Sequence, residues 1–340
     1  MLRPSLSHIV SLMKVLSVIP AGSAEGDFIF AKREAHALIT LGVECQSFFF
    51  NPSSSMISFV QDWNRFRKRA LEFDPHIIHA HYGLFTGLLT TLRRFAPTVV
   101  TFRGNDLYRS PHLPRWKDLI GKSMSYFAGA RAAAIICVSA KLAELLPTPR
   151  LRRKTTIVPE SVPLAVFVPS DKGEARRRLD WNLSERIVLF SGKKWPHSLV
   201  KRPDLARAAV ELTRAEFPTV KLFELDGTIS PNDIPNYLNA ADCLLVTSET
   251  EGGPTIVKEA MACNLPVVSV DVGDVRELLR QVSPSLIVGR EIPAIANGLV
   301  AVLRDGARSN GRNIAEREFS EGICAESLLA VYQTVLDKTT

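Results

Sequence analysis

Short apolar runs rich in β-branched residues recur along this chain, and most are followed by a segment with the periodicity of a helix. The runs lie at residues 15–20, 43–50, 76–83, 98–106, 133–139 and 155–162 in the first half, and at 186–192, 241–248 and 286–289 in the second. Strands that alternate with helices in this way build parallel sheets with right-handed crossovers. A chain of 340 residues, 46% of them hydrophobic, is also too long for one ordinary core. We therefore expect an α/β protein with two parallel-sheet domains.

Three prolines mark the join between the two halves. They stand within residues 159–172, where no long apolar run occurs, and such a stretch is typical of a linker. The prolines are Pro159, Pro163 and Pro169. We therefore expect one domain over residues 13–165 and a second over residues 166–320.

The two ends of the chain carry separate expectations. Met13 opens the first apolar run, so residues 1–12 are expected to be an extension. Residues 321–340 are expected to contain an amphipathic helix, because apolar side chains recur there at helical spacing. These side chains belong to Ile323, Leu328, Leu329, Val331, Tyr332 and Val335.

Positive charge is concentrated in the first half of the chain. The net charge of +7 divides into +10 for residues 1–165, with 21 Lys and Arg against 11 Asp and Glu, and −3 for the remainder, with 21 against 24. An anionic membrane surface, a phosphorylated substrate or a nucleic acid would each explain this bias. Composition alone does not choose among them.

The chain is expected to be cytoplasmic. No apolar run approaches the ~20 residues that span a bilayer, and the first residues lack the apolar core and cleavage site of a signal peptide. The five cysteines form no CxxC pair and lie mostly in apolar runs, which predicts buried thiols in a reducing compartment and argues against disulfides and a zinc site. They are Cys45, Cys137, Cys243, Cys263 and Cys324.

Two common phosphate-binding fingerprints are missing from the sequence. Gly22 and Gly26 follow the first predicted strand with a spacing that differs from GxGxxG, and no GxxxxGK[ST] occurs. Dehydrogenase and P-loop functions therefore lose their main support, and this loop is either a flexible connection or a binding loop. His79 and His81 share one face of a predicted strand, but no third ligand with suitable spacing accompanies them, so no metal site is expected.

Residues 246–278 are the only segment whose residue types and spacing together specify a chemistry. A buried strand is predicted at 241–248, a tight turn at Gly252-Gly253 and a helix that begins at Pro254. The first amides of such a helix have no acceptor within it and lie at the positive end of its dipole, so they favour an anion such as phosphate. These amides belong to Thr255, Ile256 and Val257.

Two carboxylates bracket this predicted anion site. Glu251 lies in the turn and Glu259 in the second helical turn, so one can meet a sugar hydroxyl while the other meets a ribose diol. Taken singly, Glu251 is explained as a charge that complements the helix dipole, and Glu259 as a solvated helix residue. Both together, with the Gly-Gly-Pro turn between them, favour a functional site.

The sequence E-G-x-P, followed by a second Glu in E-A-M-A and then by P-V-V, resembles the donor-site signature of the retaining family-4 glycosyltransferases. The run V-K-E-A-M-A-C-N-L-P and the shortened segment before it resemble the bacterial teichuronic-acid and exopolysaccharide members. The resemblance implies that Glu259 holds the nucleotide ribose and that Glu251, with Gly252 and Gly253, contacts the donor sugar. Asn264 stands where the family usually has Gly, and because Asn tolerates the left-handed conformation we expect this helix end to survive.

The resemblance also assigns roles to loops at other strand ends. Lys193 and Lys201 would direct two ammonium groups at the diphosphate, where the family carries Arg and Lys. Without that role, both would be ordinary solvated lysines. The remaining assignments are Gly227, Thr228 and Ile229 in the pocket for the base, and Gly26 near the acceptor.

Polar residues also end two strands of the first domain, and ligands of parallel sheets bind at such ends. His81 and Tyr82 are expected on the acceptor side, and Arg103 and Asp106 near the reacting sugar. Several family members have His at the position of Arg103. Because Arg stays protonated, an acid–base role here must pass to Asp106 or His81, or be absent. Asp106 could equally cap the next helix.

The resemblance implies the GT-B fold, in which two facing Rossmann-like domains enclose the active site in a cleft and a C-terminal helix crosses back to the first domain. It implies transfer of a sugar, with retention, from a nucleoside-diphosphate sugar to a glycan or lipid-linked acceptor in cell-surface polysaccharide biosynthesis. No cofactor, no nucleic acid and no metal are expected, and no Asp-x-Asp motif is present. A nucleotide-sugar epimerase or hydrolase of the same fold, and a nucleotide-sugar-binding protein without turnover, are the alternatives.

Peripheral contact with the inner face of an anionic membrane is a further expectation. It rests on the charge of the first half and on the segment DWNRFRKRALEF, residues 62–73. As a helix, this segment places Trp63, Phe66, Ala70 and Phe73 on one side and its basic residues largely elsewhere, so it can lie in the headgroup layer. The alternative is a helix that covers a sheet and keeps a solvated basic face.

Overall fold

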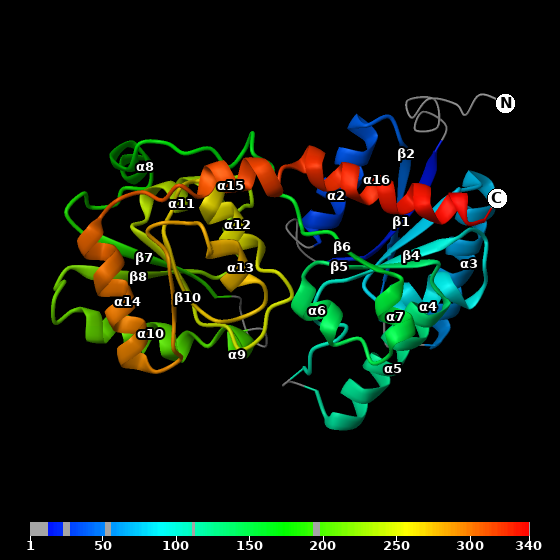
Figure 1. Ribbon diagram of the computed structural model, residues 1–340, viewed down its shortest axis with the longest axis horizontal. Helices are drawn as coiled ribbons and strands as arrows, with labels where there is room; N and C mark the ends of the chain where they lie inside the picture. The colour runs from blue at the N-terminus through cyan, green and yellow to red at the C-terminus, as the bar shows by residue number, and fades with distance from the viewer. Residues whose placement is uncertain (1–12, 23–27, 52–55, 111–112, 193–197, 340) are drawn as a thin grey trace. The chain divides into compact units, whose positions relative to one another are not determined.

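A computed structural model describes residues 13–22, 28–51, 56–110, 113–192 and 198–339. The chain forms two compact units (Figure 1). Unit 1 contains the chain up to Glu160 together with the C-terminal segment from Glu321, and unit 2 is Ser161–Ser320. The division falls inside the proline-rich stretch, just before the boundary expected at residue 165.

Unit 1 is built on a six-stranded parallel sheet with the strand order β2-β1-β3-β4-β5-β6. Its strands are β1 (Lys14–Pro20), β2 (Glu44–Phe50), β3 (Ile77–His81), β4 (Thr98–Phe102), β5 (Ala134–Cys137) and β6 (Thr155–Ile157). The chain moves outward from β1 to β2 and then resumes on the other side of β1 with β3. The carboxyl ends of β1 and β3 therefore flank the topological switch point, where open α/β sheets bind ligands.

Helices cover both faces of the unit 1 sheet because successive strand residues point to opposite sides. Leu16 and Val18 join a core cluster with helices α3 and α4, whereas Val15 joins a second cluster with α2 and the C-terminal helix α16. The helices are α2 (Ile29–Thr40), α3 (Met56–Phe73), α4 (Phe85–Leu92), α5 (Arg115–Arg131), α6 (Ala140–Glu144), α7 (Pro149–Arg153) and α16 (Glu321–Asp337).

The C-terminal helix α16 is part of unit 1, although unit 2 precedes it in the sequence (Figure 1). Its apolar stripe is buried against α2 and the sheet, with Leu328 at 1% and Tyr332 at 0% exposure. The predicted stripe at helical spacing is therefore a packing face. Only Ile323, at the start of the helix, stays exposed.

Helix α3 covers the sheet and does not offer its apolar face to solvent. Phe66, Ala70 and Phe73 are buried in the core with the strands, and Trp63 packs beside them. The prediction that this apolar face contacts a membrane is therefore wrong. An amphipathic pattern is the same for a helix that lies on a sheet and for one that lies on a bilayer, and here the sheet provides the apolar partner. None of the described helices combines the length and apolar character needed to cross a bilayer.

Unit 2 contains a five-stranded parallel sheet with the order β11-β10-β9-β7-β8. The strands are β7 (Arg186–Ser191), β8 (Val220–Leu225), β9 (Cys243–Val246), β10 (Val267–Val270) and β11 (Leu286–Val288). The helices are α8 (Lys172–Arg178), α9 (Ser198–Lys201), α10 (Pro203–Thr213), α11 (Ile234–Ala240), α12 (Thr255–Ala262), α13 (Val275–Leu279), α14 (Ile292–Asp305) and α15 (Gly311–Glu318). Its switch point lies between β7 and β9, and one continuous apolar core joins the helices to the sheet.

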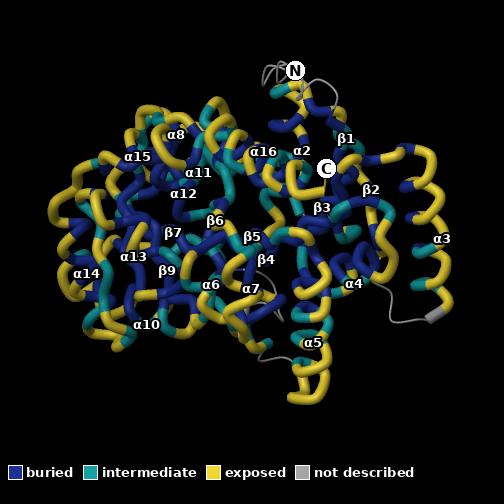
Figure 2. The backbone as a smooth tube through the Cα atoms, turned by 45° about the vertical axis from the view of Figure 1, so that its right-hand side comes forward, coloured by how far each residue is buried: buried dark blue, intermediate teal, exposed yellow. Residues whose placement is uncertain are grey.

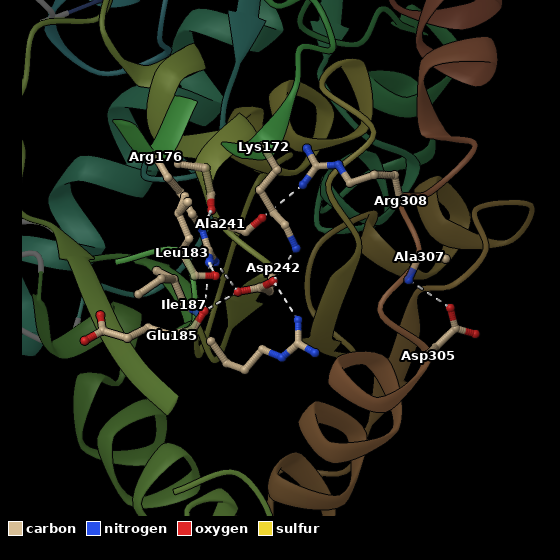
Figure 3. Close-up of polar contacts among 12 residues, drawn as sticks. Lys172, Arg176, Leu183, Glu185, Ile187, Ala241, Asp242, Asp305, Ala307 and Arg308 are labelled. Atoms are coloured by element: carbon tan, nitrogen blue, oxygen red, sulfur yellow. Dashed lines mark hydrogen bonds and ion pairs between the residues drawn. The ribbon is translucent and has the colours of Figure 1, made fainter. Parts of the chain in front are cut away.

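A cluster of buried charged side chains lies at the amino-terminal edge of the unit 2 sheet (Figure 3). Asp242 precedes β9, and its carboxylate accepts hydrogen bonds from Arg176 at 2.6 Å, from Lys172 at 2.9 Å and from the amide of Ile187 at 2.7 Å. The Arg176 side chain is only 2% exposed, and it also donates to the carbonyls of Ala240, Leu183 and Glu185. Helix α8 is thereby fixed to the start of β7 and β9.

The end of α12 adopts the predicted left-handed conformation, with a φ of 56° at Asn264. The Leu265 amide donates to the carbonyl of Ala260 at 2.8 Å, which completes the helix end. The Asn264 side chain also accepts the amide of Arg312 at 2.8 Å, a bond that Gly could not supply. The substitution of the family's Gly therefore keeps the cap and adds a link to α15.

Candidate active site

The carboxyl edge of the unit 2 sheet presents the turn and helix expected from the sequence. Strand β9 leads into Gly252-Gly253, and Pro254 immediately precedes α12, with φ of −70°. Pro254 has no amide hydrogen and its φ suits a helix start, so the chain turns sharply here into the helix. The Val257 amide already donates to the Pro254 carbonyl at 3.1 Å, and its side chain is buried. Of the three amides expected to contact an anion, the Val257 amide is therefore excluded. The expected contact is limited to the turn and to the amides of Thr255 and Ile256.

Lys201 and Glu251 meet at this edge although 50 residues separate them. The Nζ of Lys201 lies 2.6 Å from Oε1 of Glu251, and the two side chains are 18% and 14% exposed. This pair is largely shielded from water, so its electrostatic interaction is stronger than that of a surface pair. The structure thus brings together two of the predicted site residues.

The backbone around Lys201 is tied to the end of β9. The Thr247 hydroxyl donates to the carbonyls of Lys201 at 2.8 Å and Arg202 at 3.0 Å, and the Glu249 amide donates to the carbonyl of Val200 at 2.7 Å. Thr247 is fully buried. The end of α9 is thereby held where the Lys201 ammonium group meets Glu251 in the turn before α12.

Gly273 shapes the turn from the other side and is absent from the sequence-based assignments. Its φ is +54°, and a Cβ atom there would lie 2.8 Å from the carbonyl oxygen of Glu251. No residue but glycine fits this contact without moving the Glu251 backbone. The only signal in the sequence is a single glycine in the segment between β10 and α13, which many loops share.

Replacing Gly273 by Ala is expected to destabilise unit 2 through this contact. Gly306 provides the matched control, because its φ is +68° but the nearest atom to an added Cβ lies 3.9 Å away. Both substitutions carry the left-handed penalty, and only Gly273→Ala adds overpacking, worth about 1–3 kcal/mol. Urea denaturation of the two variants measures the difference. Equal losses would mean that the Glu251 turn moves without cost.

The other assigned residues of unit 2 lie at the same edge or outside the described residues. Glu259 lies within α12 and is partly exposed. Gly227 and Ile229 follow β8; Gly227 has a φ of +86° with open space around it, and Ile229 packs partly against the core. Lys193 lies outside the described residues. The structure therefore leaves its proximity to Lys201 as a prediction.

In unit 1, Arg103 lies at the centre of a buried polar cluster at the switch point. Its guanidinium donates to Glu160 at 2.7 Å, to Glu34 at 3.0 Å and to Nδ1 of His81 at 2.9 Å. It also stacks over the ring of Phe30 at 4.0 Å, and its side chain is 3% exposed. Partners from α2, β3 and the segment after β6 thus hold the two terminal nitrogens of Arg103.

The hydrogen bond from Arg103 fixes the protonation of His81. An arginine only donates, so Nδ1 of His81 accepts, and Nε2 carries the hydrogen that reaches the Ser17 hydroxyl at 3.0 Å. Burial, His79 and Arg103 hold the pKa of His81 well below its ordinary value despite Glu34. Burial opposes ionisation of Glu34, yet the polar groups of the cluster hold its pKa well below the ordinary value. The cluster is therefore an ion pair beside a neutral imidazole.

Asp106 bridges the ends of β3 and β4. Its carboxylate accepts the amide of Gly83 at 3.2 Å and the amide of Arg103 at 3.3 Å, and it is fully buried. Burial raises the pKa of Asp106 to about 6, although these amides favour the ionised form. Helix α5 begins at Arg115 after Pro114, so the expectation that Asp106 caps the next helix is wrong.

The two remaining acceptor-side assignments have different outcomes. Tyr82 follows β3 with a φ of +73° and makes edge contacts with the rings of Phe28 and Phe30. It is half-buried at the carboxyl end of the sheet, close to Arg103. Gly26 lies outside the described residues.

Family models match both halves of the chain. The model described as Glycosyltransferase Family 4 matches residues 23–166, and the model described as Glycosyl transferases group 1 matches residues 186–305. Together they span most of the chain. This chain belongs to the family-4 glycosyltransferases.

Individual relatives of this glycosyltransferase are distant in sequence. A protein of Bacillus subtilis named for glycosyl transfer in teichuronic acid biosynthesis, TuaC, is 26% identical over 282 residues, which are 77% of this chain and 71% of TuaC. A D-inositol 3-phosphate glycosyltransferase of Geodermatophilus obscurus is 29% identical over 221 residues, and the match spans about half of each protein, 55% and 48%.

Solved structures of other proteins share the fold of this glycosyltransferase. A sucrose-phosphate synthase from Thermosynechococcus elongatus matches with a TM-score of 0.74 at 18% identity, over 96% of this chain and 100% of that one. HepE of Anabaena, solved with UDP and glucose, matches with a TM-score of 0.71 at 16% identity, over 95% and 100%. The two Rossmann-like units are therefore those of the GT-B fold.

The sequence showed no third metal ligand with suitable spacing beside His79 and His81. In the structure, Glu34 of α2 lies next to both histidines. Ligand atoms of these three residues lie within 4.8 Å of one another, a distance that would suit a metal ion. The guanidinium of Arg103 already bonds both Glu34 and His81, however, and it would repel a second cation. In this glycosyltransferase the cluster is best described as an arginine-centred network, and Tyr332 of α16 joins it through His79 at 2.8 Å.

Proposed function

We propose that this glycosyltransferase moves a sugar from a nucleoside-diphosphate sugar to a hydroxyl of a glycan or lipid-linked acceptor, with retention at the anomeric carbon. The observation that carries the proposal is the Lys201–Glu251 pair beside the Gly252-Gly253 turn at the start of α12. A cation and helix-end amides favour a diphosphate, and a carboxylate beside them favours sugar hydroxyls. The complexes of HepE with UDP and UDP-glucose support a nucleotide-sugar ligand for this fold.

The proposed chemistry is electrostatic and uses no metal. When the bond between the sugar and the diphosphate breaks, negative charge grows on the leaving phosphate. The Lys201 ammonium and the amides at the start of α12 would stabilise that charge, because groups that the fold holds in place need not reorganise during the reaction. Glu259 would hold the ribose diol and Glu251 the donor sugar. Arg103 would serve the acceptor side as a fixed charge, since its partners leave it no role as a base.

Because Glu259 and Glu251 are proposed to bind different parts of the donor, their variants are expected to lose different properties. Glu259→Ala is expected to weaken free nucleoside diphosphate and donor alike, since both carry the ribose. Glu251→Gln is expected to leave the affinity for free diphosphate nearly unchanged while turnover falls. A hydrogen bond to a charged group contributes about 1.5–3 kcal/mol, so each loss should be roughly tenfold to a hundredfold. Calorimetric titration and donor turnover measure the two effects.

Glu277→Ala, an exposed glutamate of α13, is the matched control for both variants. The donor itself is found first by thermal shift, because a ligand at 100 times its Kd adds about 2.7 kcal/mol of stability. Turnover with and without an acceptor then separates a transferase from an epimerase or hydrolase. If folded Glu259 and Glu251 variants bind diphosphate and turn over donor as the control does, both assignments are overturned.

A further inference from the structure

Helices α4 and α5 of unit 1 enclose an apolar hollow that opens to solvent. Its volume is about 440 Å³, and Ser123 supplies its one polar side chain. Apolar residues from both helices line the rest of it. They are Leu88, Leu92, Leu119, Ile120, Met124 and Phe127. A ligand here would find apolar surface and almost no hydrogen-bonding partner.

The rim of this hollow is strongly exposed. Trp116, Leu119 and Ile120 are 61%, 66% and 52% exposed, and Figure 2 shows α5 protruding from unit 1 with most of its length exposed. The three side chains lie within about one turn of α5, and Phe127 and Leu92 continue the same surface at 43% exposure each. Contiguous apolar surface of this kind marks an interaction site, in contrast to single exposed apolar residues.

Positive charge predominates in the segment that carries this apolar surface. Residues 85–131 contain eight Lys and Arg against two Asp and Glu, and the pair buried among them is Arg103 and Asp106. Six of the cations are exposed, on α5 or in the segments that flank the two helices. They are Arg93, Arg94, Arg109, Arg115, Lys117 and Arg131. The ammonium group of Lys117 also lies 5.3 Å from the ring of Trp116, so a cation stands directly beside this exposed aromatic ring.

We propose that the surface formed by α4 and α5 docks this protein on a bilayer that contains anionic lipids. Trp116, Leu119 and Ile120 would enter the boundary between headgroups and acyl chains, and Arg115 and Lys117 would contact lipid phosphates. Acyl chains suit a hollow without hydrogen-bonding groups, whereas a protein partner would normally bring polar groups that need them. The surface is distinct from α3, whose apolar face is buried.

Vesicle flotation with the full-length protein tests the proposal. Wild type is expected to float with vesicles of phosphatidylcholine and phosphatidylglycerol, to float less as salt rises, and to remain behind with pure phosphatidylcholine. The triple variant W116S/L119S/I120S should bind at least about tenfold more weakly. The variant R115Q/K117Q should bind about thirtyfold more weakly, since each cation near an anionic surface contributes about a factor of five.

Matched controls change similar residues on α3. The variant I57S/L71S removes two apolar side chains that are 71% and 61% exposed, and R67Q/K68Q removes two exposed cations. Both controls should float as wild type does, with unchanged melting temperatures in every variant. No flotation at low salt, or equal loss in the α5 and α3 variants, would overturn the proposal. Concentration-dependent dimers that W116S/L119S/I120S abolishes, without vesicle binding, would assign the surface to a second copy instead.

The proposal of membrane docking and the proposed activity can be contradicted independently of each other. Flotation needs no donor and no turnover, and the α5 residues belong to no part of the proposed donor site. The triple variant should therefore bind nucleoside diphosphate as wild type does.

Discussion

Asp242→Ala is expected to lower the stability of unit 2 by about 3–5 kcal/mol, because it leaves the buried guanidinium of Arg176 without its carboxylate. Arg176 is 2% exposed and Asp242 is 6% exposed, so water cannot replace the lost partner. The amide of Ile187 loses its acceptor at the same time. A whole domain is stable by only about 5–15 kcal/mol, so this single change removes a large part of the total.

A control variant and a binding measurement separate a loss of stability from a loss of diphosphate binding. Asp204→Ala is the control, since Asp204 pairs with Arg202 at 61% and 35% exposure and should change stability by about 1 kcal/mol or less. Urea denaturation gives the loss, and hydrogen exchange of β7 and β9 assigns it to unit 2. Asp242 lies at the amino end of β9, opposite the proposed donor site, so diphosphate affinity per folded molecule should stay unchanged. A loss no larger than that of Asp204→Ala would contradict this account of the cluster.

Much of the fold follows from local sequence patterns. The strands predicted at 15–20 and 186–192 are found as Lys14–Pro20 and Arg186–Ser191, because runs of β-branched residues bounded by turns leave few alternatives. The run at 98–106 is shorter as a strand, since β4 ends at Phe102 and Gly104 has a φ of +133°. That turn is what carries Arg103 and Asp106 to the edge of the sheet.

The arginine-centred network was not predictable from one sequence. Glu34 and Glu160 lie 69 and 57 residues from Arg103, and no spacing or motif links them. Only the strand order places α2 and the segment after β6, which carries Glu160, beside the ends of β3 and β4. The donor motif was visible in contrast, because its turn and helix are contiguous. Gly273 lies against the carbonyl of Glu251, and the Thr247 hydroxyl holds the end of α9, and a sequence pattern reveals neither contact.

Lys201→Met is expected to lower donor turnover by about 100- to 1000-fold, the loss seen when one preorganised donor to a developing anion is removed. The ammonium group would act most strongly as the leaving phosphate gains charge, so kcat should fall more than donor affinity. The variant also leaves Glu251 partly buried beside the diphosphate without its cation, and like charges repel. Lys201→Arg keeps the charge and should recover part of the rate.

Lys221→Met provides the matched control for Lys201→Met. Lys221 pairs with Glu185 at 2.5 Å on β8, so its loss removes an ion pair from the same unit without touching the turn before α12. Its turnover should equal that of wild type. If Lys201→Met only lowers the urea midpoint and turns over donor at the wild-type rate per folded molecule, the Lys201–Glu251 pair is structural. The developing charge must then be stabilised elsewhere, with the amides of the α12 turn as the first groups to test, because they face the same position and carry the positive end of the helix dipole.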